Sequence, residues 1–391
     1  MNKYTCVVIG GGYAGIHTIK SIQKNIGRKI SIRIILIDPN PYHVKKVLLF
    51  KPAVGKEDIK IPWKRIFPSG VEVVQGVVTS INKEEKTIII LNNRKEESKL
   101  KYDKAVIAIG SSFQQVNSAH GGISLSSPEN AEHIYKQWNE NLKLASKATC
   151  LEEKKKLMTA TVIGAGISGI ETSAALAEQM KTVAKSMDLD PTDIQVFLIN
   201  SSNNLFTKGP GKLGKKLESR LVKMGVKVLH HTRVERVNDG IIDLNTGRRI
   251  LSGLSVWTIG LVPNPKVSNW DISLTTDGRV FVDDSYRVVG TEGIYSIGDC
   301  ARIVDPRTGI EDRMTCKEAT IQARRLGKIM RADIHHKRAP IHKTPLTTYC
   351  FGLGEKQGLV WVNLPNLNIY LSGKLGYWIR KITWDIASLV K

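Results

Sequence analysis

The sequence lacks closely spaced cysteines. Its five cysteines stand singly at positions 6, 150, 300, 316 and 350, so there is no C-x-x-C or other close pair. This spacing argues against a metal site and against a disulfide framework, and it fits a reducing cytoplasm best. Cys6 and Cys300 lie in apolar segments, where we expect them to be small buried hydrophobic residues.

Long hydrophobic runs are absent as well. No stretch approaches the roughly 18 uninterrupted apolar residues that a membrane-spanning helix needs. The first apolar run begins directly after Met1–Tyr4, so we expect no signal peptide ahead of the fold. With 391 residues, 41 % of them hydrophobic, the chain can bury large cores and should form two or three domains.

Acidic residues are scarce relative to basic ones. There are 36 Asp and Glu residues and 58 Lys and Arg residues, which gives a net charge of +22. From Thr320 to the end, twelve residues are basic and three are acidic. A basic tail predicts an anionic partner, such as an anionic membrane surface or an acidic protein, and a merely solvated surface is the alternative. Nucleic acid is not the expected partner, because there is no zinc-finger spacing or RNA-binding aromatic pattern.

The first motif is a strand, a tight turn and a helix. An apolar run ends in Gly10, Gly12 and Gly15, spaced as G-x-G-x-x-G, and passes into the helical segment Ile16–Ile26. The first glycine permits the turn, the second lets the backbone approach a pyrophosphate, and the third lets helix and strand pack closely. The helix N-terminus offers free N–H groups to that pyrophosphate.

A second apolar run completes this motif. Ile30–Ile37 has the pattern of a strand and ends at Asp38, 23 residues after Gly15. A carboxylate at this place can accept hydrogen bonds from an adenosine ribose. Strand, turn, helix, strand and acid together predict a dinucleotide site.

Further strands follow along the chain. Val71–Thr79 and Lys86–Asn92 have strand patterns with a polar turn between them, which predicts a hairpin. Tyr102–Gly110 is a buried strand that ends in Ala108 and Gly110, where the backbone is able to approach a bound cofactor.

The glycine spacing then returns. Residues 128–157 have a helical, charged pattern, and the next strand and turn carry Gly164, Gly166 and Gly169. Ile194–Ile199 is the strand that follows. Two such units in one chain are much harder to obtain by chance than one.

Asn200 takes the place of the ribose-binding acid in the second unit. It follows the strand, 31 residues after Gly169. An amide can hydrogen-bond a ribose hydroxyl, but it neither repels a 2′-phosphate as a carboxylate would nor attracts it as Arg does. NADH and NADPH therefore both stay open.

Two more strand ends belong to the pattern. Leu254–Gly260 ends in Gly260, and Gly293–Cys300 delivers Gly298 and Asp299 at its carboxyl end. Ligands gather at this edge of open parallel sheets. A helix cap is the structural alternative for Asp299.

The last residues have helical periodicity. Residues 373–391 carry an apolar stripe between two tryptophans, with basic residues nearby. Such a helix can lie in the headgroup plane of a membrane. Packing on the protein's own body or on a second subunit is the alternative. The stripe consists of Leu375, Ile379, Ile382, Ile386 and Leu389, and the flanking residues are Trp378 and Trp384.

These motifs, in this order, resemble those of flavoproteins with two dinucleotide-binding domains, over most of residues 4–330. The resemblance implies an α/β fold with two Rossmann-like dinucleotide-binding domains, the second inserted in the first, plus a small C-terminal membrane-associating segment. The expected domains are 1–115 with 266–335 for FAD, 116–265 for NAD(P)H, and a C-terminal region at 336–391. The expected cofactor-binding residues are Gly10, Gly12, Gly15, Asp38, Ala108, Gly110, Gly164, Gly166, Gly169, Asn200, Gly260, Gly298 and Asp299, of which Asp299 would contact the flavin ribityl chain.

Within these flavoproteins the chain resembles the type II NADH dehydrogenases, which are single-chain NADH:quinone oxidoreductases on the cytoplasmic membrane face. Tyr42-His43, Tyr102-Asp103, Glu171 and Pro263-Asn264 stand where that family has similar residues. By this resemblance Glu171 lies near the flavin–nicotinamide contact and is the expected catalytic residue. A first-turn acid favoured by the helix dipole is the alternative for Glu171.

The resemblance also suggests the electron path. The cysteine pair of the disulfide reductases is missing, so reduced flavin is expected to pass electrons directly to an external acceptor, with quinone as the expected acceptor. The family's quinone-site pattern A-Q-x-A-x-Q is replaced by Thr320–Arg325, in which Ala323 alone matches. A homodimer is left open. The alternative functions are a reductase of ferredoxin or another acidic carrier, a dehydrogenase-like flavoprotein with altered activity, and a flavoprotein whose redox state controls nucleic-acid binding.

Overall fold

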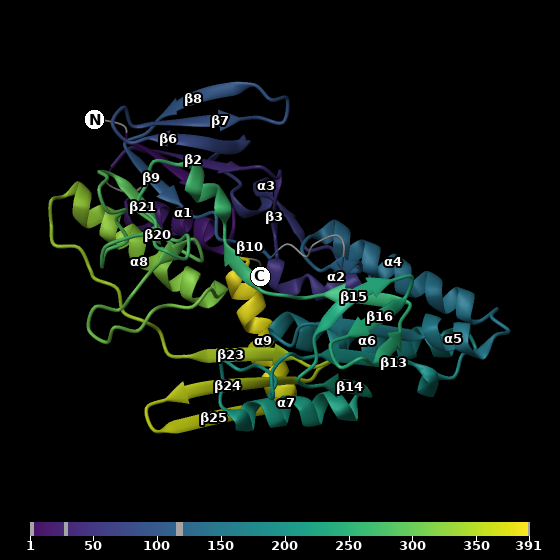
Figure 1. The fold of residues 1–391 in the computed structure, drawn as a ribbon. Helices are drawn as coiled ribbons and strands as arrows, with labels where there is room; N and C mark the ends of the chain where they lie inside the picture. The colour runs from purple at the N-terminus through teal and green to yellow at the C-terminus, as the bar shows by residue number, and fades with distance from the viewer. Residues whose placement is uncertain (1–3, 27–29, 115–119, 390–391) are drawn as a thin grey trace.

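Two five-stranded parallel sheets and a smaller C-terminal sheet organise the fold (Figure 1). The computed structural model describes residues 4–26, 30–114 and 120–389. Among these residues, no helix combines the length and the apolar character that crossing a membrane requires. Cys6 and Cys300 are fully buried, which confirms their assignment as small core residues.

The first sheet has the strand order β21-β9-β1-β2-β5, with all neighbours parallel. Its central strands are almost continuously apolar because both faces are covered, as is usual for parallel sheets. Helices α1 and α8 pack against each other beside this sheet. The bounds are β1 (Tyr4–Ile9), α1 (Tyr13–Asn25), β2 (Ile32–Asp38), β5 (Glu72–Gln75), β9 (Lys104–Ile107), β21 (Ile294–Ser296) and α8 (Cys316–Ile334).

The predicted hairpin is confirmed, but its first strand is divided at Gly76. β5 joins the parallel sheet before Gly76, and β6 pairs with β7 after it. A Cβ atom at Gly76 would lie 2.7 Å from Ile90 Cγ2, so the chain needs a glycine where it changes sheets. The antiparallel strands are β6 (Val77–Asn82), β7 (Thr87–Leu91) and β8 (Glu97–Lys101).

The second sheet has the order β11-β18-β12-β13-β14 and is also parallel throughout. The helical region predicted at 128–157 is two helices, since the first ends at Ala145. A three-stranded antiparallel sheet, β15-β16-β17, lies beside the second sheet (Figure 1). The bounds are β11 (Ile123–Ser124), α4 (Pro128–Ala145), α5 (Leu151–Leu157), β12 (Thr159–Ile163), α6 (Ile167–Ser186), η3 (Pro191–Asp193), β13 (Gln195–Ile199), α7 (Gly211–Lys223), β14 (Val226–Leu229), β15 (Val234–Asn238), β16 (Ile241–Leu244), β17 (Arg249–Leu251) and β18 (Leu254–Trp257).

The second sheet is an insertion in the first, because all of its strands lie between β9 and β21 in the chain. The two sheets are joined where their strands end. β10 (Ser111–Phe113) follows β9 and pairs with β19 (Leu261–Pro263), which follows β18. The backbone N of Gln114 donates to the Gly260 oxygen over 3.0 Å, and the Asn264 N donates to the Gly110 oxygen over 3.2 Å. The carboxyl edges of both sheets therefore meet.

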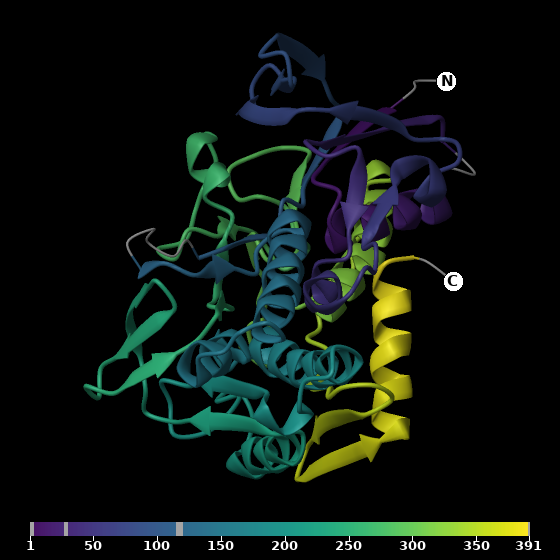
Figure 2. The same ribbon diagram turned by 90° about the vertical axis from the view of Figure 1, so that its right-hand side faces the viewer.

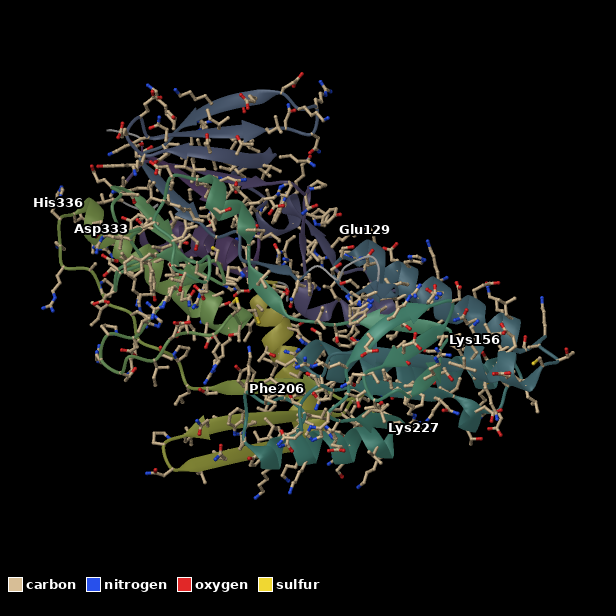
Figure 3. The ribbon with its side chains drawn as sticks, viewed as in Figure 1. Glu129, Lys156, Phe206, Lys227, Asp333 and His336 are labelled. Atoms are coloured by element: carbon tan, nitrogen blue, oxygen red, sulfur yellow. The ribbon has the colours of Figure 1, made fainter. Side chains whose placement is uncertain are left out.

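The C-terminal region is a three-stranded antiparallel sheet followed by a helix. This sheet was not predicted from the sequence, whereas the terminal helix was, and its last predicted residues, 390–391, lie outside the described chain. The Phe206 ring, from the loop after β13, contacts the rings of Tyr349 and Phe351 at 4.7 and 5.0 Å, so the sheet packs on the inserted domain (Figure 3). The elements are β23 (Thr348–Gly352), β24 (Gly358–Leu364), β25 (Leu367–Gly373) and α9 (Lys374–Ala387).

Short elements connect these layers. They are β3 (Tyr42–Val44), η1 (Lys46–Leu48), α2 (Phe50–Val54), β4 (Lys60–Pro62), α3 (Trp63–Ile66), η4 (Pro265–Asn269), β20 (Val280–Phe281) and β22 (Ala301–Arg302).

Candidate functional site

The first glycine turn joins β1 to α1. Gly10 has φ +101°, and a Cβ atom there would lie 2.6 Å from the Ala108 oxygen. A Cβ atom at Gly15 would collide with the Gly10 oxygen, so this glycine lets helix and strand pack closely. A Cβ atom at Gly12 would meet nothing within 4 Å, which means that open space adjoins the N-terminus of α1. The structure shows the roles expected of the first and third glycines, and approach of a pyrophosphate to Gly12 stays a prediction.

Asp38 lies beside this turn. Its Oδ2 accepts a hydrogen bond from the Gly11 N over 2.7 Å, and its Oδ1 accepts one from the Asn40 N over 2.8 Å. Burial raises the pKa of this carboxyl group, and the two hydrogen bonds oppose the shift. The acid predicted to bind a ribose is therefore held at the carboxyl end of β2.

His43 is a buried neighbour of the same turn. Its Nδ1 lies 2.9 Å from the Gly11 oxygen, and because a carbonyl only accepts, Nδ1 carries the proton. Nε2 is then a buried acceptor, and it has no partner among the described residues. Burial lowers the pKa of His43 to about 4, so the ring is neutral at pH 7. Because Nε2 is shielded from solvent, the ring supports the turn from the protein interior and does not face the open cradle.

Gly298 and Asp299 follow β21 in a turn. The backbone N of Gly298, at φ +79°, donates to Gln322 Oε1 over 2.8 Å. Asp299 Oδ2 accepts from the Ser111 hydroxyl over 2.6 Å, and burial raises the pKa of this carboxyl group. The helix-cap alternative for Asp299 is wrong, because the next helix, α8, begins at Cys316.

Lys46 lies within the electrostatic influence of both acids, Asp38 and Asp299, and was missed by sequence reasoning. Its Nζ donates to the Ser111 oxygen over 3.3 Å. Burial lowers the pKa of the Lys46 ammonium, while the negative charges of Asp299 and Asp38 oppose that shift. Lys46 is one of 58 basic residues, and no local pattern sets it apart. The cradle at Gly12, the Asp38 and Asp299 carboxylates and this lysine together fit a flavin dinucleotide.

The second glycine turn repeats the first. Gly164 has φ +111°, and its Cβ atom would lie 3.0 Å from the Thr258 oxygen. A Cβ atom at Gly169 would collide with the Gly164 oxygen, and one at Gly166 would meet nothing within 4 Å. A second open cradle thus adjoins the N-terminus of α6. Gly110 and Gly260, from the two sheets, both lie at the β10–β19 junction with positive φ.

Asn200 lies at the end of β13, where it was expected, but its amide serves its own loop. Nδ2 lies within 3.1 Å of the Ser202 oxygen, the Asn204 oxygen and His230 Nδ1. Oδ1 accepts from the Ser202 N over 3.2 Å. Contact of Asn200 with a ribose stays a prediction, and the visible role of its amide is to order the loop.

Glu171 forms a bidentate ion pair with Arg380 of the C-terminal helix. Arg380 Nε and Nη2 donate to Glu171 Oε1 and Oε2 over 2.9 and 2.8 Å, and the Gly352 N donates to Oε1 over 2.6 Å. Both side chains are buried. The first-turn alternative is wrong, because α6 begins at Ile167 and has no acid in its first turn. The ion pair joins α6, β23 and α9.

In the helix region aligned with the quinone-site pattern, the side chains of Thr320 and Gln322 form hydrogen bonds within the protein. Thr320 Oγ1 donates to the Cys316 oxygen over 2.8 Å, and Gln322 accepts from Gly298 as described. Ala323 is fully buried. These contacts tie α8 to the turn that carries Asp299.

Helix α9 has an apolar outer face and a polar anchor on its inner face. It lies at the edge of the molecule (Figure 2). Trp384 does not flank the outer stripe as expected, because it is buried against Phe50 at a ring distance of 6.0 Å. Ile379 and Leu389 are partly buried. The large apolar residues of α9 that are exposed by half or more are Leu375, Trp378, Ile382 and Ile386.

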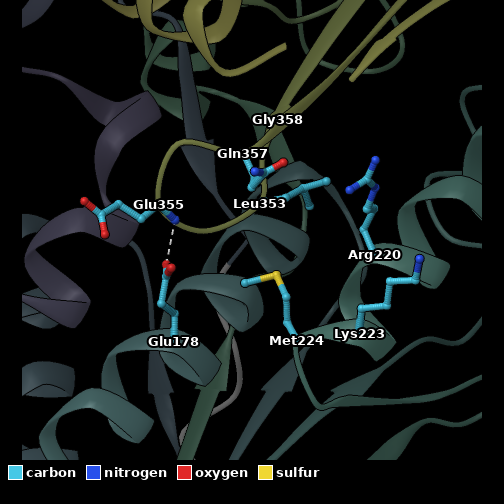
Figure 4. Close-up of a pocket in the computed structure, with 8 residues that line it drawn as sticks. All are labelled: Glu178, Arg220, Lys223, Met224, Leu353, Glu355, Gln357 and Gly358. Atoms are coloured by element: carbon cyan, nitrogen blue, oxygen red, sulfur yellow. Dashed lines mark hydrogen bonds between the residues drawn. The ribbon is translucent and has the colours of Figure 1, made fainter. Parts of the chain in front are cut away.

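A separate pocket of about 180 Å³ lies where the β23–β24 turn meets α6 and α7 (Figure 4). Glu178 Oε2 accepts a hydrogen bond from the Glu355 N over 2.7 Å at its wall. None of the predicted site residues lines this pocket, which belongs to the contact between the C-terminal sheet and the inserted domain.

Comparisons with known proteins agree with this geometry. The sequence model of the family described as pyridine nucleotide-disulphide oxidoreductase matches residues 4–323. A probable NADH dehydrogenase of Dictyostelium discoideum is 24 % identical over 98 % of this chain and 85 % of its own. A type II NADH:quinone oxidoreductase of Haemophilus influenzae is 25 % identical over 76 % of this chain and 73 % of its own.

Among solved structures, NDH2 of Plasmodium falciparum in complex with NADH superimposes with a TM-score of 0.83. The match covers 99 % of this chain and 95 % of that chain, at 17 % sequence identity. At this identity the likeness concerns the fold, and it extends through the C-terminal sheet and helix.

Proposed function

The chain belongs to the pyridine nucleotide-disulphide oxidoreductase family, and we propose that it is an FAD-dependent NAD(P)H dehydrogenase that passes electrons to a quinone. The observation that carries this proposal is the pair of open glycine cradles, at Gly12 and Gly166, on two sheets whose carboxyl edges meet. Two dinucleotides bound there would bring their reactive ends together at the junction. We divide the chain accordingly into residues 1–115 with 266–335 for FAD, 116–265 for NAD(P)H, and 336–391 as the C-terminal region.

In the first cradle, the chain's own groups bind and orient the flavin nucleotide. Gly12 leaves room for the pyrophosphate, Asp38 would accept from the ribose, and the Lys46 ammonium offsets the negative charge of the two partly buried acids. Asp299 uses Oδ2 for Ser111, so Oδ1 is its oxygen for the ribityl chain. FAD, when bound, supplies the chemistry by accepting a hydride from the nicotinamide and releasing two electrons to the acceptor.

Electrons reach the acceptor without a thiol relay in this proposal. The five cysteines are single in the sequence, and none follows either glycine turn as a close pair. The protein's contribution is then positioning and exclusion of water rather than covalent catalysis. The catalytic role expected of Glu171 stays a prediction, and the contact on which it rests is the ion pair with Arg380, which holds the C-terminal helix against α6.

We further propose that the enzyme lies on the cytoplasmic face of a membrane, bound through the outer face of α9. A helix with exposed apolar residues and flanking tryptophan and lysine residues is suited to the headgroup region. The basic excess after Thr320 would attract anionic lipids. A quinone dissolved in that membrane would be an accessible acceptor. A second copy packed on the same face, giving a homodimer, is the alternative.

The net charge of +22 favours one second candidate, a reductase of an acidic electron carrier such as ferredoxin. Anaerobic stopped-flow mixing of the purified protein with NADH, and separately with NADPH, tests the first half-reaction by flavin bleaching. Adding a menaquinone analogue or ferredoxin to the reduced protein then distinguishes the two acceptors. A protein that contains flavin but is bleached by neither nucleotide would contradict the proposed enzyme.

A further inference from the structure

A buried polar cluster beside α8 lies outside both glycine cradles. Tyr286 and His342 are fully buried, Gln322 is 2 % exposed and Asp312 is 6 % exposed. These residues come from the turn before β21, the segment before α8, α8 itself and the segment between α8 and β23. So much polar surface in a core is stable only if each group is paired.

The hydrogen bonds of this cluster have one consistent direction. Arg325 Nη1 lies 3.0 Å from His342 Nδ1, and because arginine only donates, Nδ1 is the acceptor. Nε2 lies 3.1 Å from Asp312 Oδ1 and 3.3 Å from the Thr344 hydroxyl, which donates to the same Asp312 oxygen over 2.9 Å. The Tyr286 hydroxyl accepts from Arg325 Nη1 over 2.8 Å and lies 2.8 Å from Nδ1, whose single lone pair it shares with the guanidinium.

Two further hydrogen bonds connect Asp312 to the turn after β21. Asp312 Oδ2 accepts from Gln322 Nε2 over 2.8 Å, which fixes the amide orientation of Gln322. Gln322 Oε1 therefore points at the Gly298 N and accepts from it over 2.8 Å. The chain of bonds ends on the residue before Asp299.

The backbone of Tyr286 is strained, so the contacts of this residue must stabilise its conformation. Its φ is +63°, which a bulky side chain rarely adopts. In this conformation its carbonyl oxygen accepts from the Ser296 N of β21 over 2.9 Å, while its hydroxyl reaches His342. One residue thus holds both the strand and the cluster.

We propose that Asp312 and His342, acting through Gln322, are positioning residues for the flavin nucleotide. They orient the Gln322 amide so that its oxygen accepts from the Gly298 N–H. This bond fixes the turn and so the place of the Asp299 carboxylate, which also accepts from Ser111. This inference rests on the proposed flavin site and goes beyond it, because none of the three side chains lies in the glycine cradle.

Exchanging the carboxylate at position 312 with the amide at position 322 tests the proposal. Asp312→Asn keeps the shape but leaves one acceptor oxygen where there were two, so its NH₂ group faces either Gln322 Nε2 or the Thr344 hydroxyl and His342 Nε2. In the first orientation Gln322 rotates its amide, which brings an NH₂ group against the Gly298 N–H; in the second, the donors at Thr344 and His342 lose their acceptor. The double variant D312N/Q322E restores every pairing, because the new carboxylate accepts both from the amide introduced at position 312 and from the Gly298 N. We expect D312N to weaken FAD binding about tenfold or more and the double variant to return within about threefold of the wild type.

The readout is FAD affinity, measured by titrating apoprotein with FAD and following the quenching of flavin fluorescence. Ser252→Ala is the matched control, since it removes a buried hydroxyl in the inserted domain and should leave FAD affinity unchanged. Equal affinity of D312N and wild type, or a double variant that binds no better than D312N, would overturn the positioning role.

Two further outcomes keep the test decisive. If D312N does not fold, Gln322→Met removes only the last link, and it must then weaken FAD binding while Ser252→Ala does not; unchanged affinity overturns the proposal. A wild-type protein that binds no FAD would instead contradict the proposed function itself, which separates that failure from the failure of this inference.

Discussion

Glu171 and Arg380 pair through two hydrogen bonds of 2.9 and 2.8 Å, although 209 residues separate them in the chain. The pair lies between α6 of the inserted domain and the C-terminal helix. Because both groups are buried, each depends on the other for its charge to be tolerated.

Arg380→Met should therefore leave a buried carboxylate unpaired. We expect the free energy of unfolding to fall by about 3–5 kcal/mol, measured by denaturant titration. Lys381→Met, on the exposed neighbour, should change it by less than about 0.5 kcal/mol. The double variant Glu171→Met/Arg380→Met should recover most of the loss, since two apolar side chains replace the pair. A single variant as stable as the wild type would contradict the buried ion pair.

Gly12→Ala and Gly166→Ala should separate the two nucleotide sites. Both glycines have φ near −70° and open space at the Cβ position, so alanine fits the backbone and the apoprotein should keep its stability. The added methyl group would stand where each pyrophosphate approaches. Gly12→Ala should lose bound flavin, whereas Gly166→Ala should retain flavin but raise the NAD(P)H concentration needed for bleaching about tenfold or more. Flavin content after gel filtration and stopped-flow absorbance measure the two effects.

Asn200→Asp should disturb the loop after β13. The substitution places a carboxylate against the Ser202 and Asn204 carbonyl oxygens, where the native amide donates. A loss of about 1–3 kcal/mol in unfolding free energy is expected. Ser201→Asp adds the same charge at an exposed neighbour and serves as the control, with little expected effect. Equal melting temperatures for the two variants would show that the amide contacts do not matter.

Glu318 is a buried residue in the first turn of α8, and ionisation of its carboxyl group should make the protein less stable as the pH rises. Burial raises the pKa of this carboxyl group from 4.5 to about 7, so the folded state favours its protonated form. The resulting stabilisation is complete below pH 4.5 and is lost between pH 4.5 and 7, an amount of about 3 kcal/mol. Glu318→Gln removes this titration, so the difference in unfolding free energy between wild type and variant should change across that interval. A constant difference would contradict the raised pKa.

The outer face of α9 can be tested without disturbing its inner anchor. The triple variant Trp378→Ser/Ile382→Ser/Ile386→Ser changes only side chains that are at least half exposed. Each should contribute about 1 kcal/mol to insertion, so binding to anionic lipid vesicles should fall at least about tenfold. Leu151→Ser, on α5, removes an exposed leucine elsewhere and should bind like the wild type. Vesicle co-sedimentation that is unchanged in the triple variant would rule out this membrane contact, and a shift from dimer to monomer would favour the second-copy alternative.

Sequence reasoning succeeded where the determining contacts are local. Gly10, Gly12 and Gly15 lie within one turn, and the close contacts at Gly10 and Gly15 are those that their spacing predicts. The strand and helix periods of both units also arise from neighbouring residues. The C-terminal sheet was missed; in its last strand no residue is buried, so the strand lacks a regular alternation between a core face and a solvent face.

The remaining site residues depend on long-range contacts. Lys46 acquires its position from Ser111, 65 residues away, and Arg380 from Glu171, 209 residues away. Asp312, Gln322 and His342 have no motif in common and are recognisable only once folding has brought them together. In the sequence, a single basic or amide residue that forms such a buried contact looks the same as one that is solvated at the surface.

The insertion of one sheet within another affects how the polypeptide is made. β9 and β21 are hydrogen-bonded neighbours, yet Ile107 and Ser296 are 189 residues apart in the chain. At ordinary ribosomal rates, synthesis of that interval takes on the order of 10 to 40 s. During this time the nascent first domain presents an unsatisfied apolar edge, Lys104–Ile107, while the inserted domain can already complete its own sheet. Newly synthesised chains should therefore be most vulnerable to aggregation, and most dependent on chaperones, before Ile294–Ser296 emerge.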